Sequence, residues 1–488
     1  MSSRLVSFIE LKNFGTIGYV VSALFAYFAY SSIIYPYYLG PLRNIPRGKN
    51  AFWHYIAYMY DYITGDPAKH LKLIQKYGPV VHVRNNLVVI NDASVRQYYM
   101  SYKFPKSKLY SLFNINGPNI FSALNKDFHV KMKKLISPAF NNKALAAMES
   151  SIYKAGSESL VKYLDSYLDN EPNREFDFYH LFNCNTFDVI TKMVFGTEFS
   201  TTWDEKKGYY YRDLLQKTVK GHFYRIFIPF YDRLELPIET VFKPIILENI
   251  HKRRESNGIH NDILQIMIDS EDPDTGAKLT DLEIVNECYI LLLAGMDTTA
   301  NTLTWTLYEL LKHPEILELV TTEILNNFPN LSEPITINNA KKNLKYLEAA
   351  LLETMRMHPG AGGSIPRVVP EGGVTICGHY IPPKSWIAVD IYTENNDPSF
   401  WENPREFNLD RWMGENREAN KAKSIPFGLG NRSCIGRDLA WYELYMLLAD
   451  LIRHFDFELV DEVLTPDYKL VYRPKEQTFR IKVSRKSH

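Results

Sequence analysis

One cysteine stands where a thiolate could bind a metal ion. Cys434 lies in FGLGNRSCIG, residues 427–436, directly before the helical run RDLAWYELYMLLADLI. The N–H groups and dipole at the start of a helix favour a charged thiol, and the glycines permit tight backbone turns. Phe427 can cover the sulfur and limit the access of water. Taken alone, a cysteine in a glycine-rich turn is more often a small buried apolar residue, so both interpretations stay open at this point.

A second group of polar residues occurs in AGMDTT, residues 294–299. Thr298 follows Ala294 by four residues, so in a helix its hydroxyl can bond to that carbonyl and disturb the helical ladder. Gly295 leaves room for a small ligand or a water molecule. Asp297 and Thr298 together could relay protons, which makes them candidate catalytic residues. The alternative is a polar turn on an exposed helix face.

Two further pairs of charged residues have helical spacing. Glu353 and Arg356 lie three residues apart and could form a solvated ion pair worth about 0.2–0.5 kcal/mol. His129 and Lys133 lie four residues apart in a basic stretch. His129 could donate a hydrogen bond and Lys133 could supply a point charge, without the bidentate geometry of arginine. A solvated basic helix face is the alternative for that pair.

These segments resemble the motifs of one family. The pattern F-x-x-G-x-R-x-C-x-G of residues 427–436 is similar to the cytochrome P450 signature, with every fixed position present. Residues 294–299 resemble the oxygen-activation motif of that family, and the E-x-x-R pair precedes FNLDRW, residues 407–412, which resembles another family segment. There, Leu409, Asp410 and Trp412 replace proline, glutamate and phenylalanine. All segments occur in the family's order, so the chain is identified as a member of microsomal type. The segment RVVPEGGVTICGHYIP, residues 367–382, resembles fungal secondary-metabolism hydroxylases.

The resemblance implies a mainly α fold with small β-sheets and a haem b cofactor with Cys434 as ligand of its iron. Thiolate donation favours cleavage of the O–O bond. Asp297 and Thr298 would deliver protons during oxygen activation. Glu353, Arg356 and Arg411 would form a buried structural triad. The implied cofactor-binding residues are His129, Lys133, Arg367, Phe427, Arg432 and Cys434.

The implied reaction inserts one oxygen atom of O₂ into a lipophilic organic substrate. We find no dinucleotide fingerprint or flavin domain in the sequence, so an NADPH-dependent reductase is the expected electron donor, with cytochrome b5 as a second candidate. A basic patch could steer such a partner or could be only surface charge and haem contacts. It consists of Lys421, Lys423, Arg432 and Arg437, with Lys131, Lys133 and Lys134 expected nearby. A haem-thiolate isomerase or peroxygenase that needs no reductase is one alternative, and a non-enzymatic haem or membrane scaffold is another. Substrate is expected to contact residues 103–123, 223–231 and 361–365 and the helix near Leu293.

Several elements must position these residues. The capping box T-D-L-E, residues 280–283, predicts a long helix that runs to His313 before Pro314. Two β-rich runs, residues 80–83 and 87–90, flank Asn85-Asn86 and predict a hairpin. A second β-rich region covers residues 374–392, and most of the remainder has the pattern of amphipathic helices. We therefore predict a single catalytic domain over residues 51–488.

The N-terminal segment predicts a membrane anchor. Residues 14–35 contain 22 residues without a charge, and a helix of that length spans roughly 33 Å. A cleaved signal peptide is disfavoured because the stretch is too long and lacks a small-x-small cleavage site. The flanking charges favour a cytoplasmic catalytic domain on the endoplasmic reticulum membrane. We expect the anchor to cover residues 1–35 and Pro36, Pro41 and Pro46 to make residues 36–50 an extended hinge without a helix.

The composition narrows the class of function. The chain has 488 residues, with 56 basic and 56 acidic side chains. That balance argues against nucleic acid as the main partner, because phosphate binding needs excess positive charge. Cys184, Cys288, Cys377 and Cys434 are widely scattered, which indicates a reducing compartment and no disulfide framework.

Overall fold

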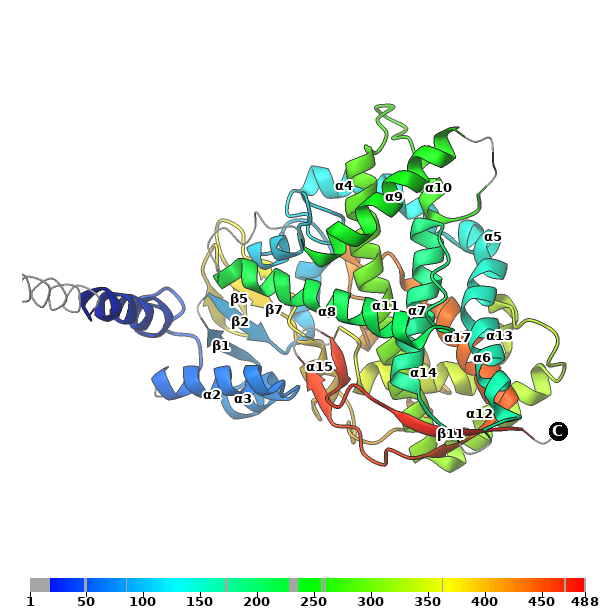
Figure 1. The fold of residues 1–488 in the computed structure, drawn as a ribbon. Helices are drawn as coiled ribbons and strands as arrows, with labels where there is room; N and C mark the ends of the chain where they lie inside the picture. Colours follow the sequence, from blue (N-terminus) through cyan, green and yellow to red (C-terminus); the bar gives the residue numbers. More distant parts are fainter. Residues whose placement is uncertain are drawn as a thin grey trace, which may run out of the picture.

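The computed structural model describes residues 18–47, 51–84, 86–171, 174–227, 236–255, 258, 260–361, 363–468 and 471–486. Helices make up most of the described chain, and the strands form small sheets (Figure 1). The α-helices of the N-terminal half are α2 (Ala51–Thr64), α3 (Lys69–Tyr77), α4 (Lys126–Ile136), α5 (Asn142–Tyr153), α6 (Ser159–Leu168), α7 (Phe178–Phe195) and α8 (Glu205–Phe227). Those that follow are α9 (Pro237–Glu255), α10 (Ile263–Asp269), α11 (Asp281–Lys312), α12 (Pro314–Asn327), α13 (Ile337–Asn343), α14 (Lys345–Met357), α15 (Ile391–Asn396), α16 (Arg417–Lys423) and α17 (Arg437–His454). The predicted fold class is confirmed.

Helix α11 passes through the centre of the body and packs against α7, α9, α14 and α17 (Figure 1). Its start is the predicted capping box. The Glu283 amide donates to Thr280 Oγ1 at 3.2 Å, and the Thr280 amide donates to Glu283 Oε2 at 2.8 Å. The helix ends at Lys312, and α12 begins at Pro314. The predicted long helix is therefore confirmed at both ends.

The largest sheet has the strand order β1-β2-β7-β4. Its strands are β1 (Val80–Arg84), β2 (Leu87–Ile90), β7 (Trp386–Ala388) and β4 (Arg367–Val368). Strands β1 and β2 form the predicted hairpin, whose turn residue Asn85 lies outside the described residues. Strand β7 runs parallel to β2, with Leu87 opposite Trp386. The sheet therefore joins the N-terminal part of the chain to the segment that follows α14.

The remaining strands form small sheets. They are β3 (Glu175–Asp177), β5 (Val374–Ile376), β6 (His379–Ile381), β8 (Phe455–Leu459), β9 (Pro466–Tyr468), β10 (Tyr472–Pro474) and β11 (Arg480–Arg485). The predicted β-rich region 374–392 supplies β5, β6 and β7, but its last two residues belong to α15. The reason is a helix cap, because Asp390 Oδ1 accepts a hydrogen bond from the Thr393 amide at 2.9 Å.

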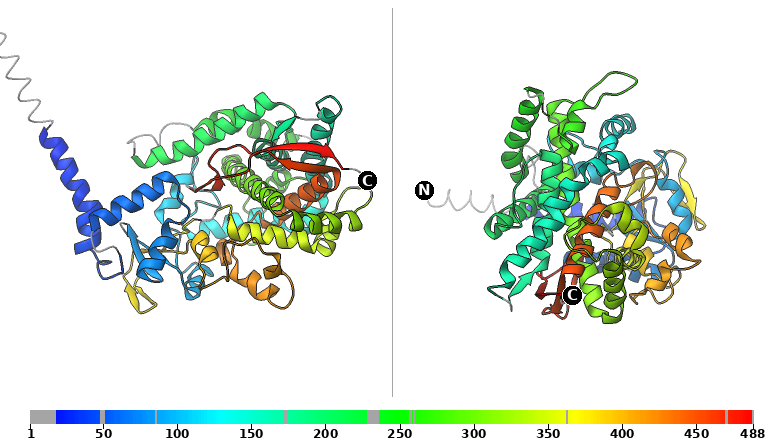
Figure 2. Two further views of the ribbon diagram at one scale, coloured as in Figure 1. Left: turned by 90° about the horizontal axis from the view of Figure 1, so that it is seen from below. Right: turned by 90° about the vertical axis from the view of Figure 1, so that its right-hand side faces the viewer.

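The apolar N-terminal helix covers Gly18–Leu39 and projects away from the body (Figure 1 and the left view of Figure 2). Its last ten residues are the π-helix η1 (Tyr30–Leu39), which contains Pro36. The expectation that no helix passes Pro36 was wrong. Proline disrupts an α-helix because its ring clashes with the carbonyl four residues earlier, whereas a π-helical turn uses wider i→i+5 spacing. The division of the chain into anchor, hinge and catalytic domain stays a prediction.

Tyr37 anchors the end of the N-terminal helix on the body. This side chain is fully buried, and its hydroxyl donates to the Val83 carbonyl at 2.7 Å. Leu42 and Ile45 are also buried, in an apolar cluster with residues of β2 and β7. The segment after the apolar helix is thus part of the folded body.

Candidate active site

The cysteine loop is a tight turn between α16 and α17. The Cys434 amide donates to the Phe427 carbonyl at 2.8 Å, and the Ser433 amide donates to the Gly430 carbonyl at 3.1 Å. Gly430 has a φ of +64°, and a Cβ there would lie 2.5 Å from the Met100 Cα. Only glycine fits that position, because both the backbone conformation and the close approach exclude a side chain. The loop therefore holds Cys434 three residues before the start of α17.

The surroundings of Cys434 raise the pKa of its thiol. Its side chain is exposed, yet desolvation is the largest influence on its pKa and raises it. The Gly436 and Arg437 amides and the Arg437 charge act in the opposite direction. The start of α17 thus only partly offsets the cost of burying a thiolate. A bound cation would complete that stabilisation, because a coordinating thiol is deprotonated outright. The ring of Phe427 lies within the same loop, 6.3 Å from Trp441 between centroids.

The polar turn of α11 has the predicted backbone interaction. Thr298 Oγ1 donates to the Ala294 carbonyl at 2.8 Å. Ala294 is exposed and Gly295, Asp297 and Thr298 are half-buried, so this turn is accessible although most of α11 is buried. Burial raises the pKa of Asp297 to about 6, and the charges of Arg473 and Arg212 oppose that rise. The carboxyl group can therefore exchange a proton near neutral pH.

Glu353 is the centre of a buried hydrogen-bond network. Arg356 Nε and Nη2 each donate to its carboxylate at 2.8 Å, and Arg411 Nε donates at 3.1 Å. Trp412 Nε1 donates to the same carboxylate at 2.8 Å. Glu353 and Arg356 are both fully buried, which excludes the solvated ion pair as the explanation of this motif. The structure thus brings together Glu353, Arg356 and Arg411. It adds Trp412, which the sequence analysis noted only as a replacement for phenylalanine.

Arg367 and Arg432 lie in one cluster of cations. Arg367 Nη1 donates to the Tyr110 hydroxyl at 3.2 Å, and Arg432 Nη1 donates to the Ala123 carbonyl at 2.6 Å. Burial lowers the pKa of Arg432 to about 10, and the charge of Arg367 contributes to the decrease. Sequence reasoning missed a third member, Lys106, whose pKa is lowered by burial and further by the charges of these two arginines.

The two residues expected from α4 lie at the edge of this cluster. His129 Nδ1 lies 2.9 Å from the Tyr102 hydroxyl, and burial together with the charge of Arg432 lowers the pKa of His129 to about 3. It is therefore a neutral hydrogen-bonding group at neutral pH. Lys133 Nζ donates to the Asn431 carbonyl at 3.0 Å, and partial burial lowers its pKa.

The segment after α14 packs close to the polar turn of α11. A Cβ at Gly360 would lie 3.3 Å from the Thr298 carbonyl oxygen, and one at Gly363 would lie 1.7 Å from the Tyr468 hydroxyl oxygen. Next to these glycines, Ser364 Oγ donates to Asp390 Oδ2 at 3.3 Å. The segment is therefore fixed by its neighbours. Of the expected substrate-contacting residues, Ile228–Tyr231 and Gly362 lie outside the described residues.

The chain is similar to known proteins along most of its length. Residues 46–480 match the family model described as Cytochrome P450. The chain is 30% identical over 482 residues to the cytochrome P450 monooxygenase lcsI of Purpureocillium lilacinum, with 94% of this chain and 92% of that protein covered. It is 27% identical over 448 residues to the trichothecene C-15 hydroxylase of Fusarium sporotrichioides, with 88% and 89% covered. Among solved structures, the cytochrome P450DA heme domain has a TM-score of 0.77 at 22% identity, covering 87% of this chain and 94% of that one, which shows a shared fold.

Proposed function

Because the chain belongs to the cytochrome P450 family, we propose that this enzyme is a membrane-anchored monooxygenase that inserts one oxygen atom of O₂ into a lipophilic substrate. The family implies a haem-iron cofactor, and the similar fungal proteins carry the names monooxygenase and hydroxylase. One observation carries the proposal. Cys434 lies in the loop directly before α17, and α17 packs against α11, the helix that contains the polar turn of residues 294–298.

The residues present fit a haem b. Cys434 would ligate the iron, the Phe427 ring would limit water access to the sulfur, and Arg367 and Arg432 would bind the two carboxylates. The fit rests on the buried Arg367 and the half-buried Arg432, because the hydrogen bonds of these arginines in the described chain go to uncharged groups. When bound, a haem with a thiolate ligand supplies electron density that favours O–O cleavage.

The side chains of α11 have distinct tasks in this proposal. The Thr298 hydroxyl is held by the Ala294 carbonyl, so its oxygen can still accept a hydrogen bond from a water molecule. Asp297, with a pKa of about 6, can take up and release protons at its carboxyl oxygens near neutral pH. The pair would thereby hold a water molecule and exchange protons beside the reacting oxygen.

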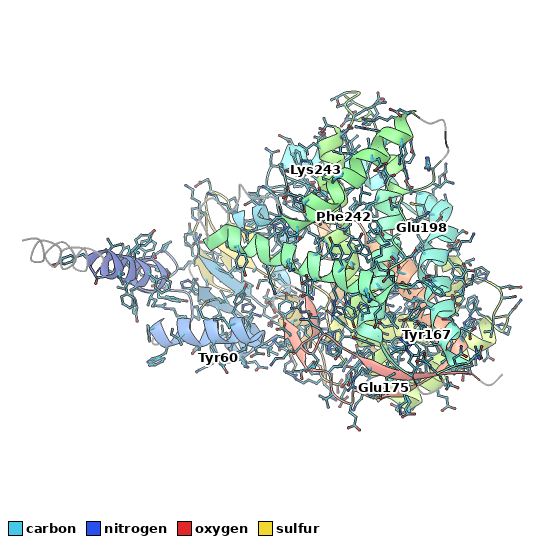
Figure 3. All side chains as sticks on the ribbon, viewed as in Figure 1. Tyr60, Tyr167, Glu175, Glu198, Phe242 and Lys243 are labelled. Atoms are coloured by element: carbon cyan, nitrogen blue, oxygen red, sulfur yellow. The ribbon has the colours of Figure 1, made fainter. Side chains whose placement is uncertain are left out.

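Two surface features support attachment to a membrane. The helix Gly18–Leu39 has the length and apolarity of a membrane span. Beside it, α2 exposes large apolar side chains at helical spacing, and Figure 3 places Tyr60 on its outer side. The exposed residues are Phe52, Trp53, Ile56, Tyr60 and Ile63. We propose a single-pass protein of the endoplasmic reticulum whose catalytic domain faces the cytoplasm and whose helix α2 lies in the lipid headgroup region.

An NADPH-dependent reductase, with cytochrome b5 as a second donor, is the proposed electron source. The basic residues considered for its docking are largely engaged within the chain. Lys421 pairs with Glu348 at 2.6 Å, and Arg437 pairs with Asp438 at 3.1 Å. A strong electrostatic steering effect from these residues is therefore not expected, and docking would depend more on shape.

The CO-difference spectrum of the reduced protein tests the proposal. We expect the strongly red-shifted band of a thiolate-ligated haem, and its loss in Cys434→Ser. Cys377→Ser is the matched control, because Cys377 is also an exposed free thiol. The absence of the band from the wild-type protein would refute the haem-thiolate assignment. Oxidation of substrate that needs NADPH and reductase distinguishes the monooxygenase from an isomerase or a peroxygenase.

A further inference from the structure

Lys106 is a buried cation in the loop before the 3-10 helix η3 (Lys108–Phe113). Only 8% of the residue is exposed. Its Nζ lies 4.3 Å from the centre of the Tyr110 ring and 4.4 Å from that of Phe121. The same atom donates one hydrogen bond, of 2.5 Å, to the Phe121 carbonyl. The two rings hold the ammonium group in place and leave it a capacity for two further hydrogen bonds.

The backbone places Lys106 directly opposite Arg367. The two residues form an antiparallel β-bridge, and next to it the Val368 amide donates to the Pro105 carbonyl at 2.8 Å. Directly opposite residues direct their side chains to the same face, and like charges in that arrangement destabilise the pair. Arg432 approaches from the cysteine loop, and the charges of both arginines oppose protonation of Lys106. Three positive groups from three separate segments therefore share one region.

Carboxylates are missing from the contacts of these three side chains in the described chain. Arg367 donates to the Tyr110 hydroxyl and the Pro366 carbonyl, Arg432 to the Ala123 carbonyl, and Lys106 to the Phe121 carbonyl. Burying a charge without a counter-charge is strongly unfavourable. The arrangement is accounted for if the three groups share an anionic ligand.

Lys133 of α4 is the other lysine that could contact this anionic ligand. Its side chain is less buried than that of Lys106 and bonds to the Asn431 carbonyl, while its neighbour His129 is neutral. Helix α4 thus supplies a neutral donor and a cation at the edge of the cluster. Of the two lysines, Lys106 is the more deeply buried.

We propose that Lys106 binds a carboxylate of the haem together with Arg367 and Arg432, and that Lys106, and not Lys133, is the principal lysine for this contact. The inference rests on the proposed haem cofactor. The alternative ligand for these cations is the carboxylate of an acidic substrate. The experiment below contains no substrate, so any effect on haem binding reports contact with the haem itself.

The test is the rate at which the holoenzyme loses haem to an excess of apomyoglobin. We expect Lys106→Met to lose haem at least about tenfold faster than the wild type, because a hydrogen bond to a charged group contributes about 1.5–3 kcal/mol. Lys106→Arg should stay near the wild type. Lys108→Met is the matched control, because Lys108 is exposed two residues along the chain. Lys133→Met should change the rate less than Lys106→Met does.

A second measurement separates binding of the haem carboxylate from a purely structural role. Removing a positive charge next to the haem should shift its reduction potential to a more negative value in Lys106→Met and leave it near that of the wild type in Lys106→Arg. Lys106→Gln serves in place of the methionine variant if that variant does not fold. An unchanged rate of haem loss in folded variants, an unchanged potential, or a larger effect from Lys133→Met would overturn the inference. A missing thiolate band in the wild-type spectrum would refute the proposed function itself, which is a separate outcome.

Discussion

The indole Nε1 of Trp412 donates a hydrogen bond of 2.8 Å to Oε2 of Glu353, and both side chains are buried. This contact gives the carboxylate a donor that phenylalanine cannot supply. We expect Trp412→Phe to lower the free energy of unfolding by about 1–3 kcal/mol, because a buried carboxylate loses a partner. Denaturant unfolding measures the change. Trp53→Phe, at an exposed indole of α2, should have little effect, and equal losses in the two variants would contradict the role given to Trp412.

Glu287 should make stability depend on pH. Burial raises its pKa to about 8, although the Ile120 amide donates to it. The folded protein therefore keeps a proton that the unfolded chain releases near the ordinary pKa of glutamate. The resulting stability is full below that value and is lost as the pH rises to about 8.

Glu287→Gln removes this dependence. Between about pH 5 and about pH 9, the stability of the variant relative to the wild type should rise by roughly 4 kcal/mol. Urea unfolding at both values measures it. Glu371→Gln, at an exposed glutamate, should show no such trend. A constant difference between wild type and Glu287→Gln would show that Glu287 titrates alike in the folded and unfolded chains.

Replacing Thr298 should uncouple NADPH consumption from product formation. Thr298→Ala removes the hydroxyl held by the Ala294 carbonyl, and we expect product formation to fall about a hundredfold. Peroxide released per NADPH consumed should rise. Both quantities are measured with reductase and a substrate identified by its spectral shift. Thr298→Ser should retain most of the activity, and a serine variant as impaired as the alanine variant would argue against a role for the hydroxyl.

Truncation should separate membrane attachment from folding. Deleting residues 1–30 removes much of the apolar helix and keeps Tyr37, Leu42 and Ile45, so we expect release from membranes with the haem retained. Deleting residues 1–46 also removes these buried side chains. It should cost several kcal/mol, because burial of one large apolar side chain contributes about 1.5–3 kcal/mol. Membrane sedimentation measures the first effect and thermal unfolding the second. If the protein without residues 1–30 still sediments with membranes, α2 is a sufficient anchor.

The parts of the site that were predictable from sequence have local causes. The capping box at Thr280 and the hydroxyl-to-carbonyl contact of Thr298 each involve residues three or four positions apart, so spacing alone indicates them. The hydrogen bonds of Glu353 with Arg356 are of the same kind. Those of Arg411 and Trp412 with Glu353 came only through resemblance or from the structure, because 58 and 59 residues separate these partners.

Lys106 was missed for the same physical reason. Nothing in its own segment distinguishes a buried lysine from the exposed Lys103 and Lys108 on either side. Its environment is made by Arg367 and Arg432, far along the chain. The helix through Pro36 was missed because a π-helical turn has no signal in the spacing of apolar residues.

The contact of Gly363 with Tyr468 couples these two positions. A methyl group at position 363 would lie 1.7 Å from the Tyr468 hydroxyl oxygen, so a larger residue there requires the Tyr468 side chain to move or to become smaller. Substitutions at positions 363 and 468 are therefore expected to have non-additive effects. If residues 361–365 contact substrate as proposed, a change of selectivity at this point depends on the pair and not on either residue alone.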